Sequence, residues 1–508
     1  MRNLFKPTSY RQGAALAVGA TALWKIISFA NALLIAAYFG AGSATDLYFY
    51  ILIALGLGTY FLQRMNSAVI IPEAMALDAK TPQQARRLLN GFLYFYAGLI
   101  VLCAGLGWFC PVGVARIFSR FALTQLATQK TLIVLGIWLF GLQLLASYLT
   151  AMLEMYRRFA VSLFTPLNAL LPLVCLFLFG SRQGIVSMMY GFVAANLIQI
   201  IVFLVVLKKE LNWQFSSWVL LPSRNFKHNL TSNQLMELVN IINGLLPIYL
   251  LSGLAAGLVS ALNYAKQLTD SASEIFSLRI TNVSKIELTE YAAREQYELF
   301  NFSYLDTHKF LCFLLTPLAV FSIFYAPEII TVFFKHGMFN VQDVAQAAAF
   351  LRPLLGVMLL AVPVLMQNNA VAAKRKLKNF LPYALTGMLL FTLTVPLAMH
   401  RYGPFAYPYT QGVCFLLTFG IHAFFFKREL PFLSFGKSLW EMVRLVLLNG
   451  TALIPGALLT TYGWAHPNPW ITLSSGGVIF VLTWGILFYF NNDLAWFMSH
   501  FKRRAPLP

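Results

Sequence analysis

Residues 39–48 read Phe39-Gly40-Ala41-Gly42-Ser43-Ala44-Thr45-Asp46-Leu47-Tyr48 and separate two hydrophobic segments near the N-terminus. One cation, Lys25, lies inside the first segment, and another, Arg64, lies near the end of the second. A charged side chain in hydrocarbon costs roughly 3 kcal/mol or more, so it is normally kept only where it faces a cavity or a partner. A chain that holds cations at that depth is expected to bind something anionic there.

The composition is that of a helical membrane protein. Of the 508 residues, 59% are hydrophobic and 11% are charged, whereas a soluble chain carries about 25% charged residues. The apolar residues fall into blocks of about 20, the length that a helix needs to cross the hydrocarbon core. We therefore expect an all-α polytopic membrane protein with about fourteen transmembrane helices, which start near Gly13, Asp46, Leu88, Thr131, Phe159, Gly184, Leu235, Leu258, Lys309, Ala345, Phe380, Pro404, Lys437 and Trp470.

The predicted spans divide into two six-helix lobes and an appendix. The expected parts are an N-terminal lobe over residues 1–207, a cytoplasmic linker over 208–234, a C-terminal lobe over 235–430, and two additional spans with a basic tail over 431–508.

A weak internal similarity supports the two lobes. Tyr48 precedes Arg64, and Tyr264 precedes Arg279, by about four helical turns in each case. Duplicated halves with a binding site between them are a common transporter plan, although two apolar segments can also resemble each other by chance. The similarity predicts a central cavity between the lobes.

The distribution of charge predicts the orientation. A net charge of +19 could suggest a nucleic-acid partner, but most of the 37 lysines and arginines fall in alternate loops, as the positive-inside rule requires. We therefore expect no nucleic-acid partner and place both termini in the cytoplasm. The eighth span is the least regular because it carries several charged residues, and an interfacial helix is the alternative there.

Three cations are candidates for binding phosphate. Lys25 is about twelve residues from either end of its span, too deep for its ammonium to reach the interface easily; its alternative role is a packing pair with a carboxylate. Arg64 and Arg279 lie near the predicted cytoplasmic ends of their spans. An arginine can bind phosphate oxygens with two parallel hydrogen bonds, and interfacial anchoring is the alternative for both.

A polar stripe follows the eighth span. Lys266, Asp270 and Glu274 are spaced four residues apart and so share one helix face. A lysine and an aspartate at this spacing can simply satisfy each other. The functional interpretation is a cavity-facing stripe in which Asp270 and Glu274 sense a coupling ion.

The sequence lacks the signatures of an enzyme or a metalloprotein. There is no Walker loop, no nucleophile elbow and no zinc motif. The five cysteines lie in or beside apolar spans without paired spacing, so we expect neither a disulfide framework nor a metal site. The chain is predicted not to be an enzyme and to need no cofactor.

Four groups of residues form a pattern that recurs in a known family: Phe39-Gly40-Ala41-Gly42 with Thr45-Asp46, Ile71-Pro72, Tyr156-Arg157-Arg158-Phe159-Ala160 with Thr165-Pro166, and Ile330-Thr331-Val332-Phe333-Phe334-Lys335-His336-Gly337-Met338-Phe339. In order and spacing, these motifs resemble the MviN/MurJ branch of the multidrug/oligosaccharidyl-lipid/polysaccharide exporter superfamily. The resemblance runs from about residue 14 to residue 430. It implies a V-shaped pair of lobes with a cationic cavity, and the flipping of undecaprenyl-pyrophosphate-linked sugars, chiefly lipid II.

The resemblance also implies cavity residues and shows departures from the family. Lys25 and Asn31 stand at the positions of two family arginines in the first span. Gln267, with Lys266 beside it, stands at the arginine of span eight, and Arg64 matches the arginine of span two approximately. The substrate-binding set is therefore predicted to include these five residues together with Arg279.

The predicted function is a bacterial inner-membrane flippase for a polyprenyl-pyrophosphate-linked saccharide, either lipid II-like or an exopolysaccharide precursor. Membrane lipids and glycan-synthesis machinery are the expected partners, and Na⁺, H⁺ or the membrane potential is the expected energy source. The alternatives are a drug or cation antiporter of the same superfamily and a membrane enzyme of glycan assembly. Cationic drugs would favour carboxylates in the cavity, and the enzyme lacks a catalytic constellation.

Overall fold

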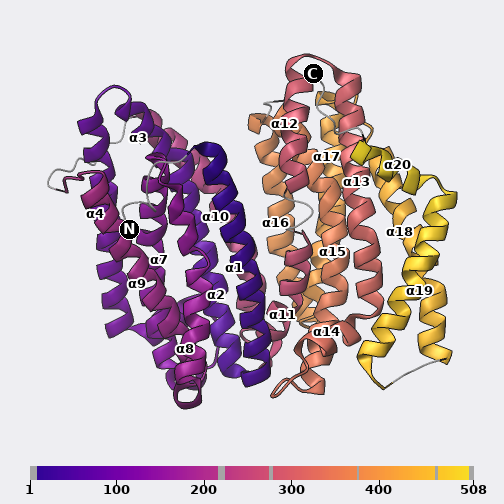
Figure 1. Ribbon diagram of the computed structural model, residues 1–508, viewed down its shortest axis with the longest axis horizontal. Helices are drawn as coiled ribbons and strands as arrows, with labels where there is room; N and C mark the ends of the chain where they lie inside the picture. Colours follow the sequence, from indigo (N-terminus) through magenta and orange to yellow (C-terminus); the bar gives the residue numbers. More distant parts are fainter. Residues whose placement is uncertain (1–8, 216–223, 274–278, 375–376, 464–466, 503–508) are drawn as a thin grey trace. The chain divides into compact units, whose positions relative to one another are not determined.

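The computed structural model describes residues 9–215, 224–273, 279–374, 377–463 and 467–502, and every regular element in these ranges is a helix (Figure 1). The chain divides into two compact units, Met1–Ser260 and Ala261–Pro508. The division falls inside one helix, α11 (Leu258–Ser273). The lobe boundaries expected at residues 207, 234 and 430 stay predictions.

The first unit is built around one buried helix, α7, which packs against α2, α4 and α9. Its elements are α1 (Tyr10–Phe39), α2 (Ser43–Met65), the π-helical turn η1 (Asn66–Ile70), α3 (Ile71–Asp78), α4 (Pro82–Phe109), α5 (Pro111–Phe118), α6 (Leu123–Thr128), α7 (Lys130–Met155), the 3₁₀ turn η2 (Phe159–Phe164), α8 (Leu167–Gln183), α9 (Val186–Glu210) and α10 (Arg224–Leu251).

The second unit has its own central helix, α15, which packs against α12, α13, α14 and α17. After α11, its elements are α12 (Arg279–Ala293), α13 (Tyr297–Phe324), α14 (Ala326–Phe334), α15 (Val341–Ala373), α16 (Leu377–Tyr402), α17 (Ala406–Glu429), α18 (Phe435–Leu458), the π-helical turn η4 (Leu459–Gly463), α19 (Pro469–Phe490) and α20 (Asp493–Lys502). The central helices α7 and α15 occupy the same place, the fourth, in the two predicted six-span halves.

Within the described residues, eleven helices are long and apolar enough to cross a membrane. This agrees with a polytopic all-α protein, but the count of fourteen stays a prediction. The other three predicted spans coincide with α10, α11 and α16. Only the stretch Asn240–Leu251 of α10 is apolar, and α11 is short and carries charged side chains.

The stretch that separates the first two spans forms a turn with a fixed anchor. Gly40 ends α1 with φ of +62°, a region that favours glycine. Asp46, in the first turn of α2, is 2% exposed. Its carboxylate accepts hydrogen bonds from the Gly257 N–H at 2.6 Å and from the Ser260 N–H and Oγ–H at 2.7 and 2.6 Å. A carboxylate at the start of α11 satisfies helix donors that have no partner within the helix.

The chain that follows α9 is docked on α4. The Trp213 indole, 4% exposed, donates to Asn90 Oδ1 at 2.7 Å, and Asn90 Nδ2 donates to the Gln214 carbonyl at 2.8 Å. The Arg86 guanidinium lies 5.4 Å from the Trp213 ring centre. The first part of the predicted linker is therefore packed against the first unit, and α10 begins within the same predicted range, at Arg224.

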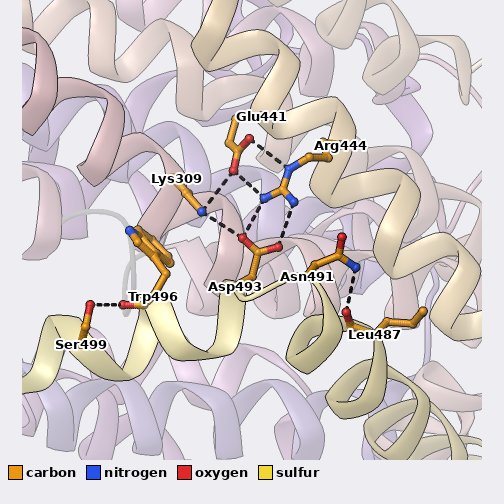
Figure 2. Close-up of polar contacts among 8 residues, drawn as sticks. All are labelled: Lys309, Glu441, Arg444, Leu487, Asn491, Asp493, Trp496 and Ser499. Carbon is orange, nitrogen blue, oxygen red and sulfur yellow. Dashed lines mark hydrogen bonds and ion pairs between the residues drawn. The ribbon is translucent and has the colours of Figure 1, made fainter.

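A closed set of ion pairs holds the C-terminal helix α20 in the second unit (Figure 2). Asp493, at the start of α20, binds Arg444 of α18 through two bonds of 2.9 and 2.8 Å and Lys309 of α13 at 2.9 Å. Glu441 completes the set, at 2.6 Å from Arg444 and 3.4 Å from Lys309. Figure 1 shows α20 lying crosswise to the long helices of its unit.

Candidate functional site

A polar cavity of about 750 Å³ lies within the first unit, among α1, α2, η1, α7, α8 and α9. Neutral amides and hydroxyls form much of its wall. The amides are Gln63, Asn66, Gln143, Asn168, Asn196 and Gln199, and the hydroxyls include Thr59, Ser67, Ser147, Thr150 and Thr165.

These side chains are partly bonded to one another. Asn168 Nδ2 donates to Gln199 Oε1 at 3.1 Å, and Gln199 Nε2 donates to Thr150 Oγ1 at 3.4 Å. On the other side, Thr59 Oγ1 donates to Gln143 Oε1 at 3.2 Å. The Asn168 Oδ1 and Asn66 Nδ2 atoms are buried without a partner. Because an unsatisfied buried polar atom is costly, the cavity wall holds unused hydrogen-bonding capacity.

Local sequence explains how the polar groups reach one place. On α7, Gln143, Ser147, Thr150 and Glu154 follow each other at steps of four, three and four residues, so they form one stripe on an apolar helix. At the end of α2 the helix widens into η1, a kind of turn that often occurs at functional sites. This turn holds Asn66, whose Oδ1 accepts from the Tyr96 hydroxyl at 2.7 Å.

Arg64 is the cation on the cavity wall. Its Nε donates to the Tyr60 hydroxyl at 2.8 Å, and its guanidinium lies 5.0 Å from the Tyr60 ring centre. The same Nε lies 3.7 Å from a carboxylate oxygen of Glu237 on α10. The Arg64 side chain is 54% exposed, whereas that of Glu237 is 16% exposed. Arg64 is thus held loosely and remains accessible.

The other predicted residues of the first unit lie near the cavity but are not among its described lining residues. Lys25 is half-buried, and its ammonium lies 5.1 Å from the ring centre of Trp24, which does line the cavity. Asn31 is 7% exposed, and its Nδ2 donates to the Ala169 carbonyl at 2.8 Å. That bond joins α1 to α8, so Asn31 has a packing role; substrate contact by Lys25 and Asn31 stays a prediction.

The remaining predicted residues belong to the second unit. Lys266 and Gln267 are half-buried on α11, and Asp270 is exposed on the same helix. Arg279 begins α12, and Glu274 lies outside the described residues. Their roles in substrate binding and ion coupling, and a cavity shared with Lys25 and Arg64, stay predictions.

The sequence argument missed most of the cavity. Gln143, Asn168, Asn196 and Gln199 were not among the predicted site residues, although the regular spacing of the stripe on α7 is a signal that could have found it. Such a stripe on a span is also what interhelical hydrogen bonding produces. The structure favours a cavity wall over bonding between helices alone, because polar side chains of α7, α8 and α9 line the same cavity.

The chemistry of the cavity suits a polyhydroxylated group next to an anion. Amides both donate and accept hydrogen bonds, as sugar hydroxyls do. Trp24 and Tyr60 add aromatic faces with polar tips, and Arg64 adds a planar cation. Across the described ranges, no group of three or more histidine, cysteine, aspartate or glutamate side chains is placed to hold a metal ion.

Comparison with known proteins agrees with this arrangement. A family model described as lipid II flippase MurJ matches residues 35–475. Among solved structures, a lipid II flippase MurJ in an inward closed conformation is similar with a TM-score of 0.77 at 18% identity, covering 95% of this chain and 100% of that chain.

Two more distant structures share the fold. An inward-facing multidrug resistance MATE family transporter of the MOP superfamily has a TM-score of 0.62 at 13% identity, covering 86% of this chain and 99% of its own. A MOP superfamily transporter from Pyrococcus furiosus has a TM-score of 0.55 at 12% identity, covering 85% and 93%. The predicted superfamily and all-α fold class are thereby confirmed. Because the family model covers most of its length, the chain belongs to the MurJ family of lipid II flippases.

Proposed function

We propose that this protein flips a polyprenyl-pyrophosphate-linked saccharide outward across the bacterial inner membrane by alternating access, and that the cavity of the first unit receives part of the saccharide. Family membership supports the flipping of a lipid-linked saccharide. The amides and hydroxyls of the wall support the assignment of the cavity, because they can exchange hydrogen bonds with the hydroxyls of a saccharide.

Arg64 is proposed to bind a phosphate by exchanging partners. Arg64 faces Glu237 at 3.7 Å, and a solvent-accessible pair of this kind contributes at most about 1 kcal/mol. A phosphate offers several charged oxygens in the planar geometry that a guanidinium matches. Glu237 would therefore hold Arg64 in place until a phosphate displaces it.

The identity of the saccharide is part of the proposal. The family description favours lipid II, whereas Lys25, Asn31 and Gln267 stand where the family carries arginines, which favours another lipid-linked glycan such as an exopolysaccharide precursor. A comparison of the two lipids in the same flipping assay decides between them.

Coupling to Na⁺, H⁺ or the membrane potential, and contact with glycan-synthesis machinery, belong to the same proposal.

The antiporter alternative has less support. The MATE transporters are 12–15% identical to this chain, which shows a common fold and nothing more. The cavity of the first unit carries Arg64 as well as Glu154, so it is not a purely acidic site for cationic drugs. The family is one of transporters, which agrees with the expectation that the chain is not an enzyme.

Filling the cavity tests the proposal. A Cβ added at Gly56, which lines the cavity, meets no atom within 4 Å. Leucine also stabilises a helix by up to about 1 kcal/mol relative to glycine. We expect Gly56→Leu to accumulate normally and to flip a lipid-linked saccharide at least about tenfold more slowly in proteoliposomes, a barrier increase of about 1.4 kcal/mol.

The matched control is Gly98→Leu on α4, where an added Cβ also meets open space but does not line the cavity. This variant should flip at the wild-type rate. Equal rates for Gly56→Leu and Gly98→Leu would show that the cavity is not on the transport route.

A further inference from the structure

The second unit contains a separate cavity of about 560 Å³ that the proposed transport function does not use. It lies among α13, α14, α15, α18, η4 and α19. Much of its wall is apolar, with Val320, Ile323 and Leu453 as examples. Tyr325 and Thr460, which share a hydrogen bond of 3.2 Å between their hydroxyls, close one side.

Two opposite charges line this cavity. Arg352, on α15, is exposed, and Glu328, on α14, is half-buried. Within the described part of the chain, they form no ion pair with each other or with another residue. Ionisable side chains among transmembrane helices are normally kept only for a partner or a function. A cavity that presents one cation and one anion is complementary to a zwitterion.

The cavity lies close to the end of the α18–α19 pair. Thr460 and Thr461, both on its wall, belong to η4, and the next residue, Tyr462, is 84% exposed. Trp470, at the start of α19, is 60% exposed. Exposed tyrosine and tryptophan at span ends mark the membrane–water interface. The cavity therefore reaches from the middle of α18, at Val446, to the level of lipid headgroups at Thr460 and Thr461, and its apolar wall can take the upper part of acyl chains.

We propose that this cavity binds a zwitterionic phospholipid with a primary ammonium, of the phosphatidylethanolamine class, with its phosphate on Arg352 and its ammonium on Glu328. An ammonium donates hydrogen bonds to a carboxylate, which the quaternary ammonium of phosphatidylcholine cannot do. Phosphatidylglycerol has the phosphate but no cation for Glu328. Comparison of phosphatidylethanolamine with phosphatidylglycerol therefore isolates the contribution of Glu328.

Native mass spectrometry of the full-length protein with added lipids of matched acyl chains tests this. Wild type should retain phosphatidylethanolamine over phosphatidylglycerol by about fivefold, the factor for one partly solvated ion pair. Glu328→Gln should remove that preference and keep phosphate-dependent binding. Arg352→Gln should weaken both lipids. Arg401→Gln, another exposed arginine of this unit that does not line the cavity, should match wild type.

A second pair of variants tests whether the phospholipid binds in this cavity, without changing its charged residues. Gly450 lines the cavity, and an added Cβ there meets open space, as it does at Gly485 on α19 outside the cavity. Gly450→Leu should lose bound phosphatidylethanolamine, and Gly485→Leu should keep it. Equal retention by these two variants, or equal binding of both lipids by wild type, would overturn the proposal. Displacement of phosphatidylethanolamine by a polyprenyl diphosphate, lost in Arg352→Gln, would assign the cavity to the transported lipid and also overturn it.

Discussion

Lys25 lies half-buried in the middle of α1, with its ammonium 5.1 Å from the Trp24 ring centre. If it attracts pyrophosphate, it acts by its charge, in a medium where charge interactions are strong. We expect Lys25→Ala to reduce flipping severely, Lys25→Arg to retain much of it, and Lys25→Glu to be worse than alanine. Complementation at matched protein levels measures the ranking. Normal export by Lys25→Met would show that the charge is not needed.

Arg64 and Glu237 give a second prediction at this scale. Removing the competing carboxylate in Glu237→Gln should lower the substrate concentration for half-maximal flipping by up to about fivefold, since the pair contributes at most about 1 kcal/mol. Arg64→Ala should raise that concentration, and Arg64→Lys should fall between because it keeps the charge and loses the fork. A Glu237→Gln variant that flips more slowly at low substrate concentration would contradict the exchange.

Single residues of the site differed in how well the sequence could reveal them. Arg64 could be predicted because a lone cation stands out against apolar neighbours. Gln143, Asn168 and Gln199 could not, because a neutral amide in a span is equally explained as a contact between helices. These side chains come together because of how α7, α8 and α9 pack, and that packing cannot be inferred from the sequence of any one helix.

At the scale of elements, Asp46 sets where α11 begins. Its carboxylate accepts the N–H groups of Gly257 and Ser260. Asp46→Asn would turn an amide donor toward these donors, and loss of a cap of this kind costs about 1–2 kcal/mol. We expect a lower midpoint of thermal unfolding in detergent, and a larger decrease for Asp46→Ala. Glu298→Gln, an exposed carboxylate in the first turn of α13, is the control and should leave the midpoint unchanged.

The attachment of α20 should depend on pH. Burial raises the pKa of the Asp493 carboxyl, but the bonds from Arg444 and Lys309 outweigh burial and lower that pKa overall. A lowered carboxyl pKa stabilises the folded state above the unfolded value of about 4, and the stabilisation is lost as the pH falls through the folded value.

Hydrogen exchange of α20 measures this dependence. Protection should be constant from neutral pH down to about 4 and should decrease below that. Asp493→Asn should be poorly protected at neutral pH and should lack the acid-induced decrease. An acid-induced decrease of the same size in Asp493→Asn would assign the effect to another group.

Elements were predictable where hydropathy is uniform. The spans expected near Thr131 and Phe159 begin at Lys130 and Phe159. The turns η1 and η4 could not be predicted, because a π turn changes the hydrogen-bonding step by one residue and has no sequence pattern of its own. Both turns contribute side chains to the walls of cavities. The two π turns, which could not be predicted from the sequence, therefore help to shape the candidate sites.

For the whole molecule, orientation is the main open prediction. Cysteines introduced at Ser181 and Tyr402 should react with an impermeant reagent from outside, and those at Lys80 and at Lys376, which lies outside the described residues, only after permeabilisation. The native cysteines need replacement first, because Cys110 is exposed. Labelling at Lys376 from outside would rule out fourteen spans with both termini in the cytoplasm.

Architecture at this scale was largely predictable, whereas the count of fourteen spans stays a prediction. The composition alone indicates an all-α membrane protein, and the order of motifs indicates the family. The regions of α10 and α11 are hard to assign from hydropathy because charged and polar residues interrupt their apolar stretches, whereas the sequence of α16 is uncharged from Phe380 to Met399. A helix of this kind is stabilised by its neighbours rather than by lipid, so its membrane crossing depends on the assembled protein.

The ion set around α20 has an electrical consequence. Lys309 and Arg444 carry two positive charges, and Glu441 and Asp493 carry two negative ones, in direct contact. Moving one elementary charge through 100 mV takes about 2.3 kcal/mol, but a set with zero net charge that moves as one body takes none. The membrane voltage therefore does no net work when these four residues are displaced together without rotating, so a voltage dependence of flipping is expected from charges elsewhere in the chain or on the substrate.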